Sequence, residues 1–173
     1  CPNTGSMQGL LKKGNKVWLT KTTNPKRKLK YTLQFIEVNN SKVGINTHIT
    51  NKIFLEALKE NKIENFDKDI NIKSEVKFGN NTRFDFLITN KKYKAFIEVK
   101  NVTLSRKSKI AEFPDTVTSR GAKHISELIK ARKKGFDVFI AFVIQREDCN
   151  KFKIADYLDE KYSSLLSKDV KKK

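Results

Sequence analysis

The sequence lacks the features that mark membrane and secreted proteins. No apolar run in its 173 residues approaches the about 20 residues that a membrane-spanning helix needs. The N-terminus has no basic stretch followed by an apolar one, so no signal peptide is visible. The two cysteines, Cys1 and Cys149, have no metal-binding spacing and do not suggest a disulfide framework. We therefore expect a cytoplasmic protein without a membrane partner.

Other absences narrow the organisation of the chain and its chemistry. No internal repeat or low-complexity linker is visible, and 173 residues suit one ordinary domain or two small ones. Neither the cysteines nor the two histidines, His48 and His124, have convincing partners for a nucleophilic triad. The chain also lacks an initiator methionine, and "CPNTGSM" is typical of the inside of a domain, so we expect a fragment.

Acidic residues are scarce relative to basic ones. The chain has 19 Asp and Glu against 37 Lys and Arg, which gives a formal net charge of +18. Such an excess favours an anionic partner, and DNA or RNA is the usual one. Only six of the 37 are arginine, and asparagine and isoleucine are also plentiful. Codon bias in an AT-rich genome is therefore an alternative explanation for much of the charge.

The first 45 or so residues are predicted to form only β-structure. Short strands are expected at residues 16–21, 31–38 and 42–46, with a turn at Asn39-Asn40-Ser41 between the last two. The basic segment "NPKRKLK" forms the loop between the first two strands. No helix is needed in this part of the chain.

From residue 47 the pattern changes to mixed helices and strands. A helix is expected over 47–61, with Thr47 or Thr50 as its cap, and three strands follow at 71–78, 82–89 and 94–102. A loop then runs to about residue 117. A helix over 119–134 ends at Gly135, and the apolar run 136–144 predicts a buried central strand. An amphipathic helix over about 154–167 completes the order α-β-β-β-α-β-α.

The three consecutive strands carry an unusual row of acids. Symmetric hairpins with loops at 79–81 and 90–93 place Asp85 opposite both Glu75 and Glu98. Alternation then puts Glu75, Asp85, Glu98 and Lys100 on one face. The other face is predicted to be a core formed by Ile72, Val76, Phe84, Phe86, Ile88, Ile97 and Val99.

A row of like charges points to a metal-ion site. Directly opposed like charges cost roughly 0.2–1 kcal/mol per pair, so a row of acids is a poor choice for stability. A divalent cation, Mg²⁺ or Mn²⁺, bound by Asp85, Glu98 and Glu75 would relieve the repulsion. Lys100 leaves the same face as Glu98, where it could stand beside a metal-bound water and a phosphate. The alternative is a solvated sheet face of mixed charge. Glu56 or Glu60 of the preceding helix could supply a further acid, but neither can be placed.

These motifs carry a resemblance to known families. "RFDFLI" followed by "AFIEVKNVTL" resembles the D…E-x-K signature of the PD-(D/E)XK nuclease superfamily. Together with "CPNTGSM", "SEVKFG", "FPDTVTSRGAKHISEL" and "DEKYSSLL", they resemble the bacterial sugar fermentation stimulation protein A family over nearly the whole chain. The resemblance gives Asp85, Glu98 and Lys100 the metal-binding and catalytic positions, and it implies DNA binding and a proposed DNA/RNA nuclease activity.

The same resemblance implies a fold and a division into domains. We expect an OB-like β domain over residues 1–46, followed by a restriction-endonuclease-like αβββαβ domain over 47–173. The family pattern normally has a stretch before "CPNTG" and another after the last helix, and both are absent from this sequence. The expected OB-like barrel is therefore incomplete, and the C-terminal end of the second domain is expected to be missing.

Two further groups of residues are candidates for contacts with nucleic acid. Thr118 or Ser119 can cap the helix over 119–134, and its N-terminus would suit a phosphate held by Arg120 and Lys123. His124 could donate to phosphate, support the site or be structural, while Asp115 could cap the helix or approach the metal. In the first domain, Lys26, Arg27 and Lys28 form a basic loop near Trp18, which would suit a single strand unless Trp18 belongs to the core.

We therefore expect a nucleic-acid-binding protein with a Mg²⁺-dependent nuclease site. One alternative is a DNA-binding regulator of sugar metabolism that keeps the nuclease scaffold without cutting. A weaker alternative is an RNA-associated accessory protein whose charge reflects codon bias alone. Sequence does not decide between DNA and RNA or define the oligomeric state.

Overall fold

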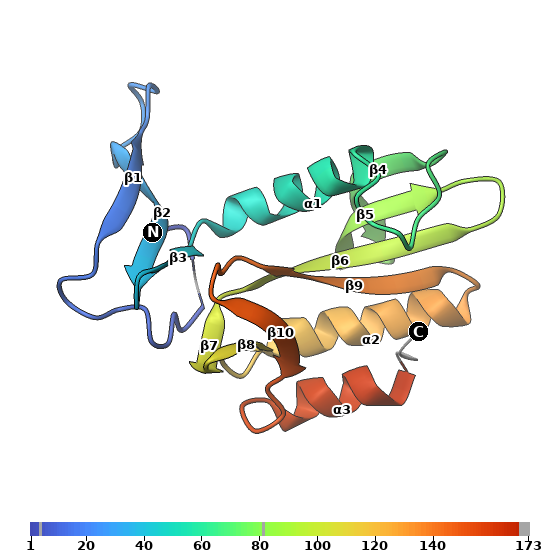
Figure 1. Cartoon of the computed structure of the whole chain (residues 1–173). Coiled ribbons are helices and arrows are strands. Elements are labelled where there is room, and N and C mark those ends of the chain that lie inside the picture. Colours follow the sequence, from blue (N-terminus) through green and yellow to red (C-terminus); the bar gives the residue numbers. More distant parts are fainter. Residues whose placement is uncertain (4, 81, 170–173) are drawn as a thin grey trace.

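The protein consists of a small N-terminal β-sheet and a larger part in which helices cover a second sheet (Figure 1). The structure is a computed structural model that describes residues 1–3, 5–80 and 82–169. Of the helices in these ranges, none is long and apolar enough to cross a bilayer.

The N-terminal sheet contains the three predicted strands. β1 (Val17–Lys21), β2 (Tyr31–Val38) and β3 (Ser41–Gly44) form an antiparallel sheet in the order β1-β2-β3. The predicted turn between β2 and β3 is confirmed: Asn39 and Asn40 have φ values of 51° and 61°, which asparagine tolerates in tight hairpins. One side of the sheet packs on a small core formed by Met7, Leu10, Ile36, Val43 and Ile45.

The helix that follows begins differently from the prediction. A short 3-10 helix, η1 (Thr47–Ile49), leads into α1 (Thr50–Lys59). Neither Thr47 nor Thr50 caps the helix; the cap of η1 is Asn46, whose side chain accepts a hydrogen bond from the amide of His48. The predicted capping residue was wrong because η1 moves the start of the helical segment towards Asn46.

A four-stranded sheet forms the centre of the larger part. β4 (Asn71–Phe78), β5 (Thr82–Thr89), β6 (Lys94–Val102) and β9 (Asp137–Ile144) lie in the order β4-β5-β6-β9, and β9 runs parallel to β6. α1 packs on one face, and α2 (Ser119–Lys133) covers the other, ending at Gly135 in the left-handed region as predicted. For this sheet and the two helices that pack on it, the predicted order αβββαβ is confirmed.

The registers around the acidic row are also confirmed. Val76 pairs with Phe84, and Phe86 pairs with Ile97. Continued by one residue, the second register sets Asp85 opposite Glu98. The predicted loop between β4 and β5 lies only partly within the described residues, because Asn81 lies outside them.

The prediction that one face of the three strands forms a single core was wrong for two residues. Phe86, Ile88, Ile97 and Val99 pack towards α1, whereas Val76 and Phe84 belong to a second cluster with Leu128 and Ala131 of α2. The alternation fails at Glu75, whose φ of 56° is incompatible with a regular strand. Beyond this point the end of the β4–β5 hairpin packs on the α2 face of the sheet.

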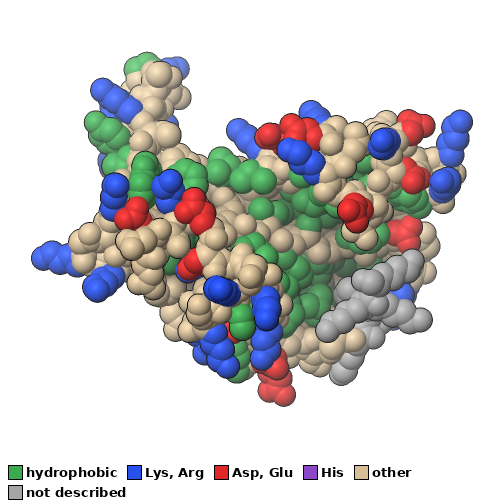
Figure 2. Space-filling model, in the orientation of Figure 1, with side chains coloured by type: hydrophobic (Ala, Val, Ile, Leu, Met, Phe, Trp, Pro, Cys, Tyr) green, Lys and Arg blue, Asp and Glu red, His purple; other side chains and the backbone are tan. Residues whose placement is uncertain are grey.

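β9 is an edge strand among the described residues, and not the predicted central strand. Its side chains from Val138 to Val143 are only half-buried. Figure 2 shows apolar side chains at the surface between α1 and the C-terminal helix, where β9 crosses the molecule. An apolar run identifies a strand, but it does not fix the position of that strand in the sheet.

A second three-stranded sheet was not predicted. β7 (Leu104–Lys107) and β8 (Lys109–Phe113) occupy the segment that we expected to be a loop. β10 (Cys149–Ile154) pairs with β8 in parallel, and α3 (Glu160–Asp169) starts after it. The predicted helix over 154–167 therefore began too early, because its first residues end a strand and form a turn.

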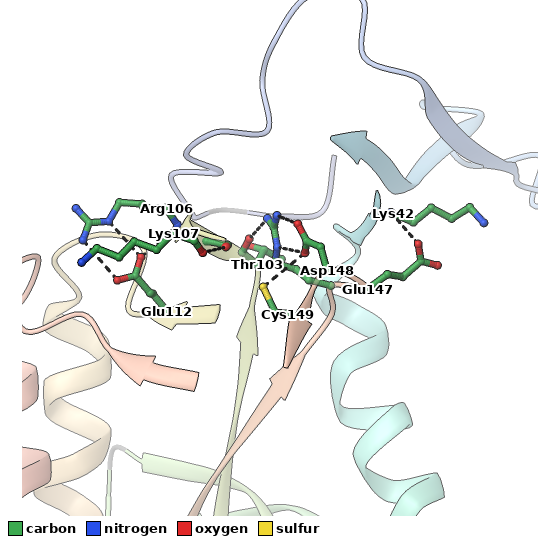
Figure 3. Close-up of polar contacts among 10 residues, drawn as sticks. Lys42, Thr103, Arg106, Lys107, Glu112, Glu147, Asp148 and Cys149 are labelled. Atoms are coloured by element: carbon green, nitrogen blue, oxygen red, sulfur yellow. Dashed lines mark hydrogen bonds and ion pairs between the residues drawn. The ribbon is translucent and has the colours of Figure 1, made fainter. Parts of the chain in front are cut away.

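The two parts of the chain are joined by hydrogen bonds that Figure 3 shows in part. The amide of Lys42 in β3 donates to Glu147 Oε2 at 3.0 Å, and the amide of Gly44 donates to the carbonyl of Gln145 at 2.8 Å. Arg146, between them, donates to the carbonyl of Thr103 and pairs with Asp148. The segment after β9 thus continues the N-terminal sheet and fixes it beside the larger part.

Candidate active site

A cavity of about 750 Å³ lies between the β4–β5 hairpin, the end of β6 and the start of α2. Its acidic and basic lining includes most of the residues predicted for the site. Segments from the N-terminal part also reach it, which makes the cavity a shared feature of both parts. The lining residues used below are Asn3, Gly5, Glu75, Arg83, Asp85, Glu98, Lys100, Asp115, Arg120 and His124.

Glu98 is the most buried acid in this cavity. It projects from β6 towards α2, and its side chain is only 6% exposed. One oxygen, Oε1, accepts from Lys100 Nζ at 2.6 Å and contacts His124 Nδ1. The other oxygen, Oε2, is buried and has no hydrogen-bond partner among the described residues. An unpaired carboxylate oxygen is costly in a protein interior, so Oε2 is a candidate ligand position.

Asp85 lies where the hydrogen bonding between β5 and β6 is interrupted. Its Oδ2 accepts from the amide of Val99 at 2.7 Å, and its Oδ1 accepts from Asn51 Nδ2 of α1 at 2.8 Å. The carboxylate thus takes the place of a backbone carbonyl from the neighbouring strand. Each carboxylate oxygen has a second lone pair, so both can still bind a cation.

The two carboxyl groups have pKa values shifted in opposite directions. Burial raises the pKa of Asp85, and the charge of Glu98 adds to this, against the hydrogen bonds from Val99 and Asn51. Burial also opposes ionisation of Glu98, but its contacts with His124 and Lys100 outweigh burial and hold the pKa below its usual value. Glu98 is therefore ionised at neutral pH. A nearby positive charge would stabilise the ionised form of Asp85.

The start of α2 faces the same cavity. As predicted, Thr118 caps the helix, and its Oγ1 accepts from the amide of Gly121 at 2.9 Å. Arg120 lines the cavity and is exposed. His124, one turn later, is brought to Glu98, so the structure supports its placement in the site. Lys123 lies on the exposed side of this turn and does not belong to the cavity lining within the described chain.

The other predicted acids are less closely associated with Glu98. Glu75 lines the cavity, but its side chain is 58% exposed and forms an ion pair with Arg83 at 3.7 Å. Asp115 also lines the cavity, from the loop before α2. Glu56 is exposed on α1 and Glu60 is exposed at its C-terminal cap, where it pairs with Lys62, and the structure does not bring either to the cavity.

The N-terminal segment forms a wall that sequence analysis did not anticipate. The amide of Gly5 donates to Asn3 Oδ1 at 2.8 Å, and Ser6 Oγ donates to the carbonyl of Asp115. A Cβ atom on Gly5 would lie 2.5 Å from Asp115 Oδ2, so only glycine allows this approach. Thr4, within the same motif, lies outside the described residues. The motif was recognisable in the sequence, but its long-range contact was not.

The predicted nucleic-acid contacts in the first part lie elsewhere. Lys26, Arg27 and Lys28 are exposed in the loop before β2, and Trp18 is half-buried on β1. The ring of Trp18 is covered by the ammonium groups of Lys16 and Lys42, at 5.1 and 5.6 Å from its centroid. None of the predicted four lines the carboxylate cavity in the described structure.

The residues present can accommodate a divalent cation that keeps several waters. Within the described ranges, no three His, Cys, Asp or Glu side chains converge closely enough to enclose a metal ion. Mg²⁺ usually needs only one or two carboxylates, with water and phosphate completing its shell. Asp85 and Glu98 line the same cavity and could supply such a pair, and hydrogen bonds from Asn51 and Val99 hold the carboxylate of Asp85 in place.

Known proteins show the same two-part organisation. The family description "Sugar fermentation stimulation protein RE domain" matches residues 48–173, and "SfsA N-terminal OB domain" matches residues 1–45. The chain belongs to the sugar fermentation stimulation protein family. A homologue of this name from Pelagibacter ubique is 52% identical over 170 residues, covering 97% of this chain and 73% of its own. One from Brucella ovis is 42% identical, covering 98% and 71%.

A solved structure of the same family has the same fold. SfsA of Pyrococcus furiosus, determined in complex with Ca²⁺, superposes with a TM-score of 0.85 at 29% sequence identity. The match covers 95% of this chain and 70% of that one. The N-terminal β-sheet of this family member is therefore an OB domain, as expected, and the larger part is the family's second domain.

Proposed function

We propose that this member of the sugar fermentation stimulation protein family is a metal-dependent nuclease that hydrolyses phosphodiester bonds in DNA or RNA. The observation that carries the proposal is that Asp85, Glu98 and Lys100 line one cavity, and that Glu98 keeps one carboxylate oxygen, Oε2, without a hydrogen-bond partner among the described residues. The site lies in a chain of net charge +18, which favours an anionic polymer as substrate.

Asp85 and Glu98 would hold the metal ion. A bound Mg²⁺ or Mn²⁺ would supply a water of lowered pKa and would stabilise charge developing on the phosphate. Asp85 is prepared for this role because Asn51 and Val99 fix both its oxygens. The raised pKa of Asp85 indicates that its ionised form lacks compensation, which a cation would supply.

Lys100 and His124 would position groups around the phosphate. The ammonium group of Lys100 lies 2.6 Å from Glu98 Oε1. This contact fixes the position of its positive charge in the cavity. His124 Nδ1 faces the same oxygen, which orients the ring within the cavity. The N-terminal turn of α2, with Arg120, would bind further phosphate oxygens.

The relatives give this proposal two kinds of support. The Pyrococcus furiosus protein is described in complex with Ca²⁺, a hard cation that binds oxygen ligands as Mg²⁺ does. The OB domain belongs to a fold class that commonly binds single strands through a basic groove and aromatic side chains. Lys26, Arg27, Lys28 and Trp18 are our candidates for that contact.

A non-catalytic nucleic-acid-binding protein on the same scaffold is a second candidate. The observation in its favour is that Lys100 and His124 both contact Glu98 Oε1, which satisfies much of the buried charge without a metal. This alternative predicts salt-dependent binding to nucleic acid that persists in Asp85→Asn and no cleavage in the presence of any divalent ion.

Cleavage by matched variants distinguishes the two. End-labelled single-stranded and duplex DNA and RNA are incubated with the purified protein and Mg²⁺ or Mn²⁺. We expect cleavage by the parent, none with a chelator, and a loss of about 100-fold or more in Lys100→Met. Lys52→Met, on the exposed side of α1, serves as the control. Equal cleavage by the parent and Lys100→Met would show that the site is misassigned.

A further inference from the structure

We propose that a groove beside the carboxylate cavity binds the backbone of a single nucleic-acid strand that passes through that cavity. The groove lies between the end of α2 and the tip of the β4–β5 hairpin and measures about 500 Å³. This inference deepens the proposed nuclease function and rests on it. It names the substrate as an extended single strand and assigns a second contact to it.

One wall of the groove is strongly basic. α2 contributes Lys130 and Lys133, and its C-cap contributes Lys134, against one acid of α2, Glu127. Among the described residues, the hairpin contributes uncharged side chains to the opposite wall: Phe78, Gly79, Asn80 and Thr82. A groove with one cationic wall and one neutral wall of mostly small residues suits a chain of phosphates that contacts lysines on one side.

The groove and the carboxylate cavity are both lined by residues of the β4–β5 hairpin and of α2. Arg83 of the cavity directly follows Thr82 of the groove along β5. On α2, His124 of the cavity is one turn from Glu127 of the groove, and Lys134 lies further along the same side. The helical rise places the levels of His124 and Lys134 about 15 Å apart, a span of a few nucleotides. In Figure 1, α2 runs beneath the sheet from β8 to the opposite end of the molecule.

The lysines are presented to solvent at this end of the helix. Lys133 and Lys134 are exposed, and the ammonium group of Lys134 lies 5.2 Å from the centroid of Phe78 across the groove. Lys130 pairs with Glu127 at 2.7 Å, and its side chain is 63% exposed. A helix C-terminus favours lysines in general, which accounts for some of this charge.

The helix dipole does not account for the adjoining surface. Lys134 also lines a neighbouring hollow together with Lys91, Lys92 and Lys94, which belong to the β5–β6 loop and the start of β6. The basic surface therefore continues from α2 onto the sheet, beyond the reach of the helix C-terminus. A continuous line of cations from two elements is the arrangement that an anionic polymer needs.

The depth of the cavity favours a single strand over a duplex. The side chains of Glu98, Lys100 and His124 are 6%, 15% and 14% exposed, so the scissile phosphate must enter a recess. The phosphates of a duplex lie on a stiff rod, with a persistence length of about 150 base pairs. A single strand can bend into the recess while its neighbouring phosphates follow the groove.

Binding without metal tests the groove separately from cleavage. Fluorescence anisotropy in chelator measures the affinity for labelled single strands of about 4 and about 16 nucleotides, a range of site sizes known for single-strand binding, and for a duplex of the longer strand. The test variant is Lys133→Gln/Lys134→Gln. The matched control is Lys52→Gln/Lys59→Gln on α1, which packs on the other face of the sheet. Circular dichroism confirms that both remain folded.

We expect the test variant to bind the longer strand about tenfold more weakly than the control. Two lost phosphate contacts should also reduce the slope of log affinity against log salt by about 1.4. The shorter strand should be unaffected if it sits in the cavity. DNA and RNA strands share the backbone chemistry, and comparing them shows which one is preferred.

Three outcomes would overturn the inference: equal weakening in both variants, no change in either, or a greater loss for duplex than for single strand. The nuclease proposal fails separately. If the groove variant shows the expected loss but the parent never cuts with Mg²⁺ or Mn²⁺, the groove stands and the nuclease assignment falls. If the parent cuts and the groove variant matches the control in affinity, the nuclease assignment stands and the groove proposal falls.

Discussion

Asp85 has two roles that two substitutions can separate. Besides facing the cavity, its carboxylate accepts hydrogen bonds from the backbone amide of Val99 and from the side-chain amide of Asn51. Val99 is only 8% exposed. Asp85→Ala removes both acceptors, whereas Asp85→Asn retains a carbonyl oxygen for Val99. Asn51 can rotate its own amide to accept from the new side chain.

The expected costs differ accordingly. A buried amide that loses its acceptor costs about 1–3 kcal/mol, and the lost bond from Asn51 adds to this. We therefore expect Asp85→Ala to lower the free energy of unfolding by about 2 kcal/mol or more. Because burial and Glu98 raise the pKa of Asp85, its charge disfavours the folded state at neutral pH. Asp85→Asn should then be at least as stable as the parent.

Urea denaturation followed by circular dichroism measures both variants under the same conditions. If Asp85→Ala is as stable as the parent, then Asp85 does not close the interrupted hydrogen bonding between β5 and β6. If Asp85→Asn is as unstable as Asp85→Ala, the charge of the carboxylate, and not its shape, supports the fold. Asp85→Asn is consequently the better variant for activity measurements.

Three further predictions follow from buried or crowded groups. The hydroxyl of Tyr162 is buried without a partner among the described residues, so Tyr162→Phe should leave the melting temperature unchanged or raise it; a fall of several degrees would mean that the hydroxyl is bonded. Gly5→Ala should leave nucleic-acid binding in chelator unchanged or stronger, with little loss of stability, since the new methyl group would displace only an acidic side chain, Asp115, from the cavity wall; a clear loss of affinity in anisotropy would refute this. As the pH falls from about 7 to about 3, protonation of Asp85, whose pKa is raised, should first increase the melting temperature. Protonation of Glu98, whose pKa is lowered, should then remove stabilising contacts and decrease it. Asp85→Asn should show the decrease but not the initial increase.

Local patterns were sufficient to predict the elements and registers closest to the site. The loop lengths and the alternation in β5 and β6 set Asp85 opposite Glu98, and Gly135 marked the end of α2. The prediction that one face would be a single core failed because Glu75 adopts a left-handed conformation, which alternation assumes not to occur. Phe84, which pairs with Val76 just beyond Glu75, packs towards α2.

Contacts between distant segments could not be predicted from the sequence. β8 and β10 pair across about 40 residues, and each strand is short and rich in charge, so neither shows a clear period. The sequence gives no sign that Asn51 of α1 is special; its role appears only in the folded structure, where its side chain donates to Asp85. The need for glycine at position 5 is explained by its close approach to Asp115, which lies 110 residues further along the chain.

The initial rate of single-strand cleavage as a function of Mg²⁺ concentration tests the central claim most directly. The parent and Asp85→Asn are compared at equal concentrations, after denaturation has shown that both are folded. We predict a rate that rises to saturation with Mg²⁺ in the parent and no detectable rate in Asp85→Asn. Cleavage by Asp85→Asn with the same metal dependence, or no cleavage by the parent with Mg²⁺ or Mn²⁺, would contradict the assignment of the cavity.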